Sequence, residues 1–178
     1  MKKQFIFLLV ALSISHYLSA QSDSTNCTIS LKAIDLSENM SRLSTKDDEV
    51  ILLLYKKTNS EETLHAPVCQ TEFVLDSTRK EKTLTNLTLQ NSNYLIFILE
   101  RDDERTIEQI DPIFRVYYQE IAKLYAKKDW LGLEKYMGDS DLLGYVEFSL
   151  SKSESEIEFK GRQNMDSYHY KLTINHSK

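Results

Sequence analysis

The sequence predicts an all-β fold, an antiparallel β-sandwich of about eight strands. Several short segments alternate apolar and polar residues with a period of two, which is typical of strands with one buried face. The run Val50–Tyr55 is apolar throughout and indicates a strand buried on both faces, and Tyr94–Leu99 is the strongest candidate for a central strand. The predicted strands lie at residues 29–33, 50–55, 68–75, 87–89, 94–99, 146–150, 157–159 and 168–174.

The N-terminus has the pattern of a secretory signal peptide over residues 1–20. Lys2 and Lys3 precede an apolar stretch at residues 5–12, and Ser19-Ala20 supplies small residues for cleavage. The alternative, a membrane anchor, requires roughly 20 apolar residues, and this stretch is shorter. The signal resembles those of Bacteroidetes-type bacteria. We therefore expect an exported chain, periplasmic or extracellular, with one domain at residues 21–178.

One segment, at about residues 105–137, has helical rather than strand periodicity. Asp111-Pro112 resembles a helix N-cap followed by proline at the first helical position. Asp129 could cap a second short helix at residues 130–137, with Gly138 as its stop. We expect a helical hairpin inserted at the rim of the sandwich, where loops commonly carry function.

The two cysteines, Cys27 and Cys69, favour a disulfide, because an exported chain with an even cysteine count commonly pairs its thiols. No Cys-x-x-Cys motif indicates a redox site. We therefore predict a structural bridge between them.

The composition is acidic, with 27 Asp and Glu against 22 Lys and Arg and a net charge of −5. Cleavage of the predicted signal peptide would remove Lys2 and Lys3, which leaves the rest of the chain more acidic. Such a domain has no electrostatic reason to bind nucleic acid. The expected partner is an unknown protein or a component of the cell envelope.

Acidic residues stand at the ends of three predicted strands. If these strands are neighbours, their loop ends converge and could supply oxygen ligands to calcium, which takes six to eight of them. The alternative is that the acids are simply solvated at strand ends. The candidate calcium ligands are Asp48, Glu100, Asp102, Asp139 and Asp141.

The order of these motifs resembles that of a C2 domain, over most of residues 27–174. Residues 33–36 resemble the end of a first C2 strand, and Asp48 the aspartate that opens the second. Residues 100–102 resemble the end of the sixth strand, residues 141–146 the start of the seventh, and residues 159–172 the last. The resemblance implies calcium-dependent association with phospholipid surfaces. Glu100 replaces an aspartate of the family pattern, and this departure favours a vestigial site.

No motif indicates catalysis. The sequence lacks Gly-x-Ser-x-Gly, a glycine-rich phosphate loop and histidines at zinc-ligand spacing. We assign no catalytic residue and expect no enzyme, with a hydrolase on the acidic rim as the weakest alternative. Tyr118 and Trp130 of the hairpin are the candidates for a partner surface. The favoured function is a non-enzymatic binding module.

Overall fold

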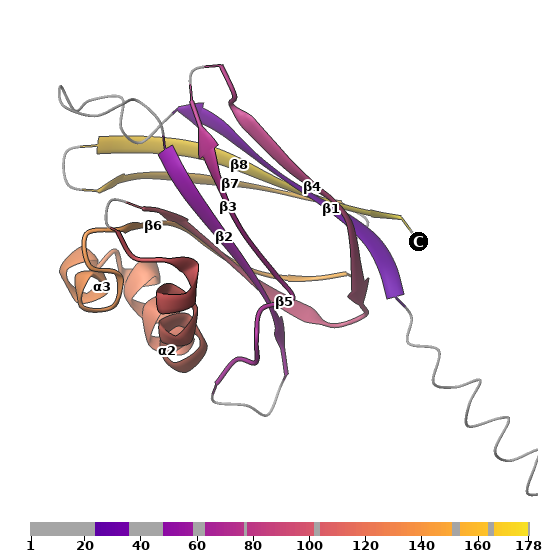
Figure 1. Ribbon diagram of the computed structural model, residues 1–178, viewed down its shortest axis with the longest axis horizontal. Coiled ribbons are helices and arrows are strands. Elements are labelled where there is room, and N and C mark those ends of the chain that lie inside the picture. The colour runs from indigo at the N-terminus through magenta and orange to yellow at the C-terminus, as the bar shows by residue number, and fades with distance from the viewer. Residues whose placement is uncertain are drawn as a thin grey trace, which may run out of the picture.

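The predicted β-sandwich is confirmed. A computed structural model describes residues 24–35, 48–58, 63–76, 78–101, 104–150, 154–163 and 166–177, so the predicted signal peptide lies outside the described residues. Two four-stranded antiparallel sheets, with strand orders β4-β1-β8-β7 and β3-β2-β5-β6, form the body of the domain (Figure 1). The strands are β1 (Ser24–Asp35), β2 (Asp48–Lys57), β3 (Cys69–Leu75), β4 (Glu81–Gln90), β5 (Asn93–Glu100), β6 (Asp141–Ser149), β7 (Glu154–Gln163) and β8 (Asp166–Ser177).

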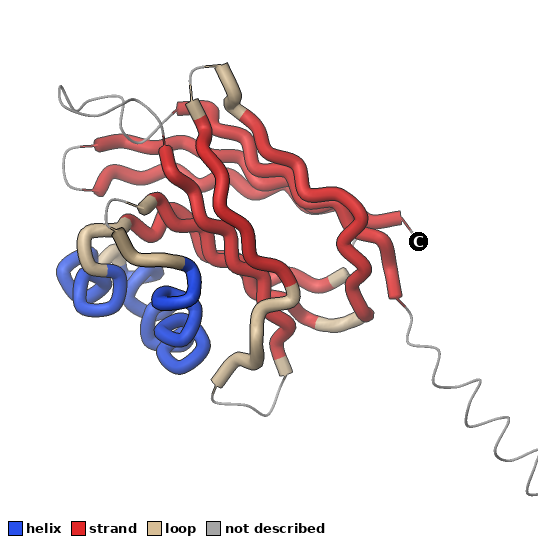
Figure 2. The backbone as a smooth tube through the Cα atoms, viewed as in Figure 1, coloured by secondary structure: helices blue, strands red, loops and turns tan. Residues whose placement is uncertain are grey.

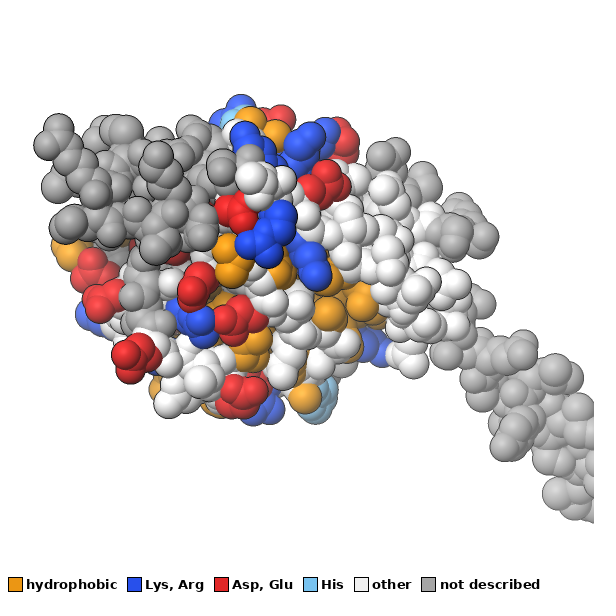
Figure 3. Space-filling model, turned by 45° about the horizontal axis from the view of Figure 1, so that its top comes forward, with side chains coloured by type: hydrophobic (Ala, Val, Ile, Leu, Met, Phe, Trp, Pro, Cys, Tyr) orange, Lys and Arg blue, Asp and Glu red, His pale blue; other side chains and the backbone are white. Residues whose placement is uncertain are grey.

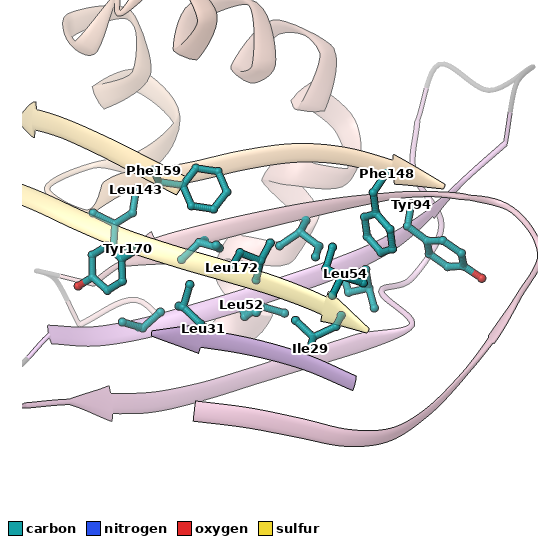
Figure 4. Packing of buried hydrophobic residues seen from close by; sticks show 14 of the residues in the cluster. Ile29, Leu31, Leu52, Leu54, Tyr94, Leu143, Phe148, Phe159, Tyr170 and Leu172 are labelled. Atoms are coloured by element: carbon teal, nitrogen blue, oxygen red, sulfur yellow. The ribbon is translucent and has the colours of Figure 1, made fainter. Parts of the chain in front are cut away.

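The space between the two sheets holds the first hydrophobic core. Alternate side chains of facing strands point into it, as the two-residue period of a strand requires. Figure 4 shows Leu52 and Leu54 of β2 beside Ile29 and Leu31 of β1. All four are at most 1% exposed. The other members of this core include Val50, Tyr94, Ile96, Ile98, Leu143, Phe148, Phe159, Tyr168, Tyr170, Leu172 and Ile174.

A second core lies on the other face of the β3-β2-β5-β6 sheet. The helices α2 (Ile107–Lys127) and α3 (Trp130–Met137) pack there (Figures 1 and 2). Phe97 of β5 is fully buried, and its ring contacts Tyr55, Phe114 and Tyr145, with centroids 6.0, 4.6 and 5.1 Å away. The expectation of a rim insertion is therefore wrong, because the hairpin covers a sheet face as a third layer.

The helix boundaries are set by local caps. The start predicted at Asp111-Pro112 is wrong, because α2 begins at Ile107 with Thr106 as N-cap and Pro112 lies inside it. Gln109 forms a capping box in which its Oε1 accepts a hydrogen bond from the Thr106 N–H at 2.9 Å. The prediction for α3 is confirmed, since the Asp129 carboxylate accepts from the Gly132 N–H and Gly138 ends the helix with φ 65°. No described helix is long and apolar enough to cross a membrane.

The predicted Cys27–Cys69 disulfide is wrong, since both cysteines are free. Cys27 lies on β1 and Cys69 on β3, which belong to opposite sheets. The Cα atoms of a disulfide are usually about 4.4–6.8 Å apart, and the two cysteines are not within bonding distance of each other. Burial raises the pKa of both thiols, that of Cys27 to about 11. Both behave as small apolar residues of the core.

The first prediction concerns these thiols. Protein denatured without reductant should show two titratable thiols, because no bond joins them. In the native state, alkylation of Cys27 should be much slower, since its thiol is buried and its raised pKa leaves little thiolate. Mass spectrometry after alkylation, with and without denaturant, measures both. Absence of free thiols in the denatured protein would contradict the structure.

The second prediction concerns the hairpin. Phe97→Ala should lower the free energy of unfolding by about 3–5 kcal/mol, because it leaves a cavity between sheet and helices. Deleting residues 104–135 should abolish cooperative folding, since it exposes the whole second core. The exposed Leu131 of α3 provides a control, and Leu131→Ala should change stability by less than about 0.5 kcal/mol. Urea denaturation followed by circular dichroism measures these changes, and a deletion variant as stable as the full chain would refute this role.

Candidate functional site

Three of the predicted calcium ligands gather at one end of the β3-β2-β5-β6 sheet. Glu100, the last residue of β5, is the register partner of Asp141, the first residue of β6. Glu100 also pairs with Val50, two residues beyond Asp48 at the start of β2. Thus β2 and β6 begin where β5 ends. We call Asp48, Glu100 and Asp141 the acidic end.

The acidic end faces the space between the sheets. Residues 94, 96 and 98 of β5 belong to the inner core, so alternation places Glu100 on the same face. Residues 50, 52 and 54 place Asp48 on that face of β2, and Asp141 shares the face of its partner Glu100. The exposed fractions of Asp48, Glu100 and Asp141 are 0%, 3% and 8%. These three acids are buried, which overturns the alternative that they are solvated at strand ends.

The five predicted ligands do not come together as one described site. Asp139 is exposed in the turn before β6, and Asp102 lies outside the described residues. Within the described ranges, no group of three or more His, Cys, Asp or Glu side chains is placed to hold a metal ion. Each carboxylate of the acidic end has other interactions in the fold.

The C2-like motifs are shifted by one strand. The resemblance places residues 100–102 at the end of a sixth strand and Asp141 ahead of a seventh, but β5 ends at Glu100 and β6 begins at Asp141. Asp48 does open the second strand, as the resemblance implies. The strand predicted at 146–150 begins five residues earlier, so Asp141 is paired within β6 and Asp139 lies in the turn before it.

Tyr168 of β8 lies near Asp141 of the acidic end, and Tyr170 lies in the same inner core, on the same face of the strand. Burial raises the pKa of Tyr168, and the neighbouring Tyr125 and Asp141 raise it further, so its phenol stays neutral. The Tyr125 hydroxyl donates to the Leu143 carbonyl at 3.0 Å. Tyr170 is fully buried, and its hydroxyl has no hydrogen-bond partner among the described residues. Neutral phenols beside a carboxylate are hydrogen-bond donors rather than nucleophiles.

Arg101 is also tied to the same end of the sheet. Its guanidinium contacts Glu49 of β2 at 2.7 Å and Glu72 of β3 at 2.6 Å, so it spans neighbouring strands. Its backbone N–H donates to the Glu49 carbonyl at 2.8 Å. This charge therefore fastens the end of β5 to the sheet. On the face drawn in Figure 3, basic and acidic side chains are interspersed.

The predicted partner surface is wrong for Tyr118, whereas Trp130 is half-buried. Tyr118 is only 5% exposed and packs in the second core, and Trp130 packs edge-on against Tyr125 with ring centroids 6.1 Å apart. On the outside of the hairpin, Val116 and Tyr117 are 51% and 46% exposed. They border a hollow of about 720 Å³ on the outer side of α2. Its lining, here called the hairpin groove, is Val116, Tyr117, Gln119, Glu120, Lys123, Leu124 and Lys127.

No family model and no curated protein sequence matches the chain. A solved structure described as "Structure of a C2 domain" is similar at 9% identity, with a TM-score of 0.34. The match covers 85% of this chain and 98% of that one. The β-sandwich itself rests on the strand pairing described above.

The third prediction concerns the acidic end. Millimolar calcium should leave the melting temperature unchanged, because Asp139 faces solvent and the described acids form no metal-ligand group. Asp141→Asn should keep or raise stability, by up to about 1 kcal/mol, because like charges on directly opposite strand positions are unfavourable. Thermal unfolding of both proteins, with calcium or with a chelator, measures this. A saturable rise in melting temperature with calcium that Asp141→Asn removes would show a functional calcium site.

Proposed function

We propose that this chain is an exported, non-enzymatic binding module of the cell envelope, and that it binds a protein partner through the hairpin groove. The observation that carries the proposal is the exposed apolar surface of Val116 and Tyr117 on a helix whose opposite face is fully used by the core. Exposed apolar side chains beside a polar rim are typical of interaction surfaces.

Two of the groove side chains, Tyr117 and Leu124, pack against other parts of the protein before any partner binds. The Tyr117 ring packs on Tyr136 of α3, with centroids 5.1 Å apart. Leu124, also in the groove lining, packs against the second core. A preorganised surface loses little side-chain entropy on binding, which favours affinity. Helix α2 thus has a structural inner face and a separate outer face.

The charges of the groove indicate the chemistry of the partner. Lys123 and Lys127 lie one helical turn apart on its lining, and Glu120 lies one turn before Lys123. The two lysines exceed the single acid in an otherwise acidic chain. We infer a partner segment with one or two large apolar side chains next to acidic residues, since complementary charge steers and orients association.

Calcium-dependent association with a phospholipid surface is the second candidate function. The resemblance of the strand-end motifs to those of a C2 domain is the reason to consider it, whereas the described acids form no metal-ligand group. The calcium titration of the preceding subsection distinguishes it from the groove proposal, because binding at the groove requires no metal.

The fourth prediction tests the groove. A displayed random-peptide library selected on the domain should enrich peptides with apolar and acidic residues. Tyr117→Ala should weaken a selected peptide by about tenfold or more, as expected for an aromatic anchor. Selection on the Lys123→Glu/Lys127→Glu variant should instead enrich basic peptides. Biolayer interferometry measures the affinities.

The matched control is Lys82→Glu, an exposed lysine of β4 on the other sheet. It should leave both the enriched sequences and the affinity unchanged. Selected peptides that bind the Tyr117→Ala protein as well as the original would refute the groove as the binding surface.

A further inference from the structure

A second hollow lies at the end of the β3-β2-β5-β6 sheet opposite the acidic end. Lys57 of β2, Asn93 of β5 and Ser149 of β6 form one row across three strands, because Asn93 is the register partner of both. Thr58 and the turn residues 91–92 complete the lining. The hollow has a volume of about 410 Å³, and none of the described residues that line it is apolar. We call it the polar hollow.

The polar hollow begins where the hairpin stops covering the sheet. Tyr55 and Leu95 are buried under the helices, and alternation places Lys57 and Asn93 on the same face, one step further along. The Lys57 Nζ contacts both carboxylate oxygens of Glu147 at 2.8 Å. The hydrogen bond and charge of Glu147 raise the pKa of Lys57, so the ammonium stays protonated and paired. The charge of the lysine is thereby balanced within the protein.

The turn between β4 and β5 is anchored on both sides. The Tyr94 hydroxyl donates to the Gln90 carbonyl at 2.8 Å, and the Lys56 ammonium donates to the Gln90 side-chain oxygen. The turn side chains that follow, at residues 91–93, have no hydrogen-bond partner among the described residues. The residues on either side of them, Gln90 and Tyr94, are held by hydrogen bonds, and the side chains of residues 91–93 remain available to a ligand.

These side chains have a definite chemical preference. Each asparagine amide offers two donors and an acceptor, and the Ser92 hydroxyl donates and accepts. Adjacent hydroxyl groups of a sugar likewise both donate and accept. A free anion would find its positive partner, Lys57, already neutralised by Glu147, and an apolar ligand would find no apolar side chain among the described lining residues. The volume falls within the roughly 300–1,000 Å³ of small-molecule sites.

We propose that the polar hollow binds one unit of a neutral carbohydrate, with the amides of Asn91 and Asn93 hydrogen-bonded to its hydroxyl groups. This site is independent of the hairpin groove, from which it differs in elements, lining and chemistry.

The fifth prediction tests this site by NMR. The ¹⁵N-labelled protein is titrated with the methyl glycosides of glucose, galactose, mannose and N-acetylglucosamine. At least one should cause saturable shifts of the side-chain amide signals of Asn91 and Asn93. Asn91→Ala/Asn93→Ala should weaken its binding by about tenfold or more, since two hydrogen bonds are lost. Asn175→Ala, an exposed position of β8, is the matched control and should leave binding unchanged.

Two results would overturn the proposal. One is the absence of saturable shifts with all four glycosides. The other is saturable shifts at these residues with inorganic phosphate and with no glycoside, which would show an anion site governed by Lys57. Melting curves of the Asn variants, expected to match the original protein, confirm that any loss of binding reflects the removed amides.

Discussion

The burial of both faces of β2 and β5 is the constraint on which the rest of this structure depends. Six consecutive residues of β2, Val50–Tyr55, are at most 1% exposed, and so are six of β5, Tyr94–Leu99. A sheet with two apolar faces needs a cover on each. The β4-β1-β8-β7 sheet covers one face and the helical hairpin covers the other, so the domain has three layers rather than the two of a simple sandwich.

The same constraint locates the polar sites. The covers protect the middle of the central sheet, and polar side chains collect at its two ends. At one end, Asp48, Glu100 and Asp141 lie on the inner face beside the buried phenols of β8. At the other end, Asn93 and the Lys57–Glu147 pair lie on the outer face beyond the helices. The two ends therefore differ both in face and in chemistry, one rich in carboxylates and the other in neutral amides and hydroxyls.

One face of helix α2 packs in the core, and another face is exposed and available for binding. Phe114, Tyr118 and Ile121 of α2 are committed to the second core, and Val116 and Tyr117 lie on the side away from it. A helix places these roles on separate faces because its side chains repeat every 3.6 residues. Changes on the outer face can therefore alter binding with little effect on stability, which makes the proposed function separable from the fold in experiment.

The sequence by itself determined the eight strands, the helical hairpin and the short helix with its caps at Asp129 and Gly138, because alternation, periodicity and capping are local properties of the chain. It also identified Val50–Tyr55 as buried on both faces, without indicating what would cover them. The tertiary structure alone decided which layer the hairpin forms, that Cys27 and Cys69 stay apart, and that Tyr118 is buried while Tyr117 is exposed. It also brought Glu100 beside Asp141 and buried both, and it aligned Asn93 with Lys57 and Ser149. The physical reason is that burial and register depend on partners distant in sequence, which local patterns do not specify.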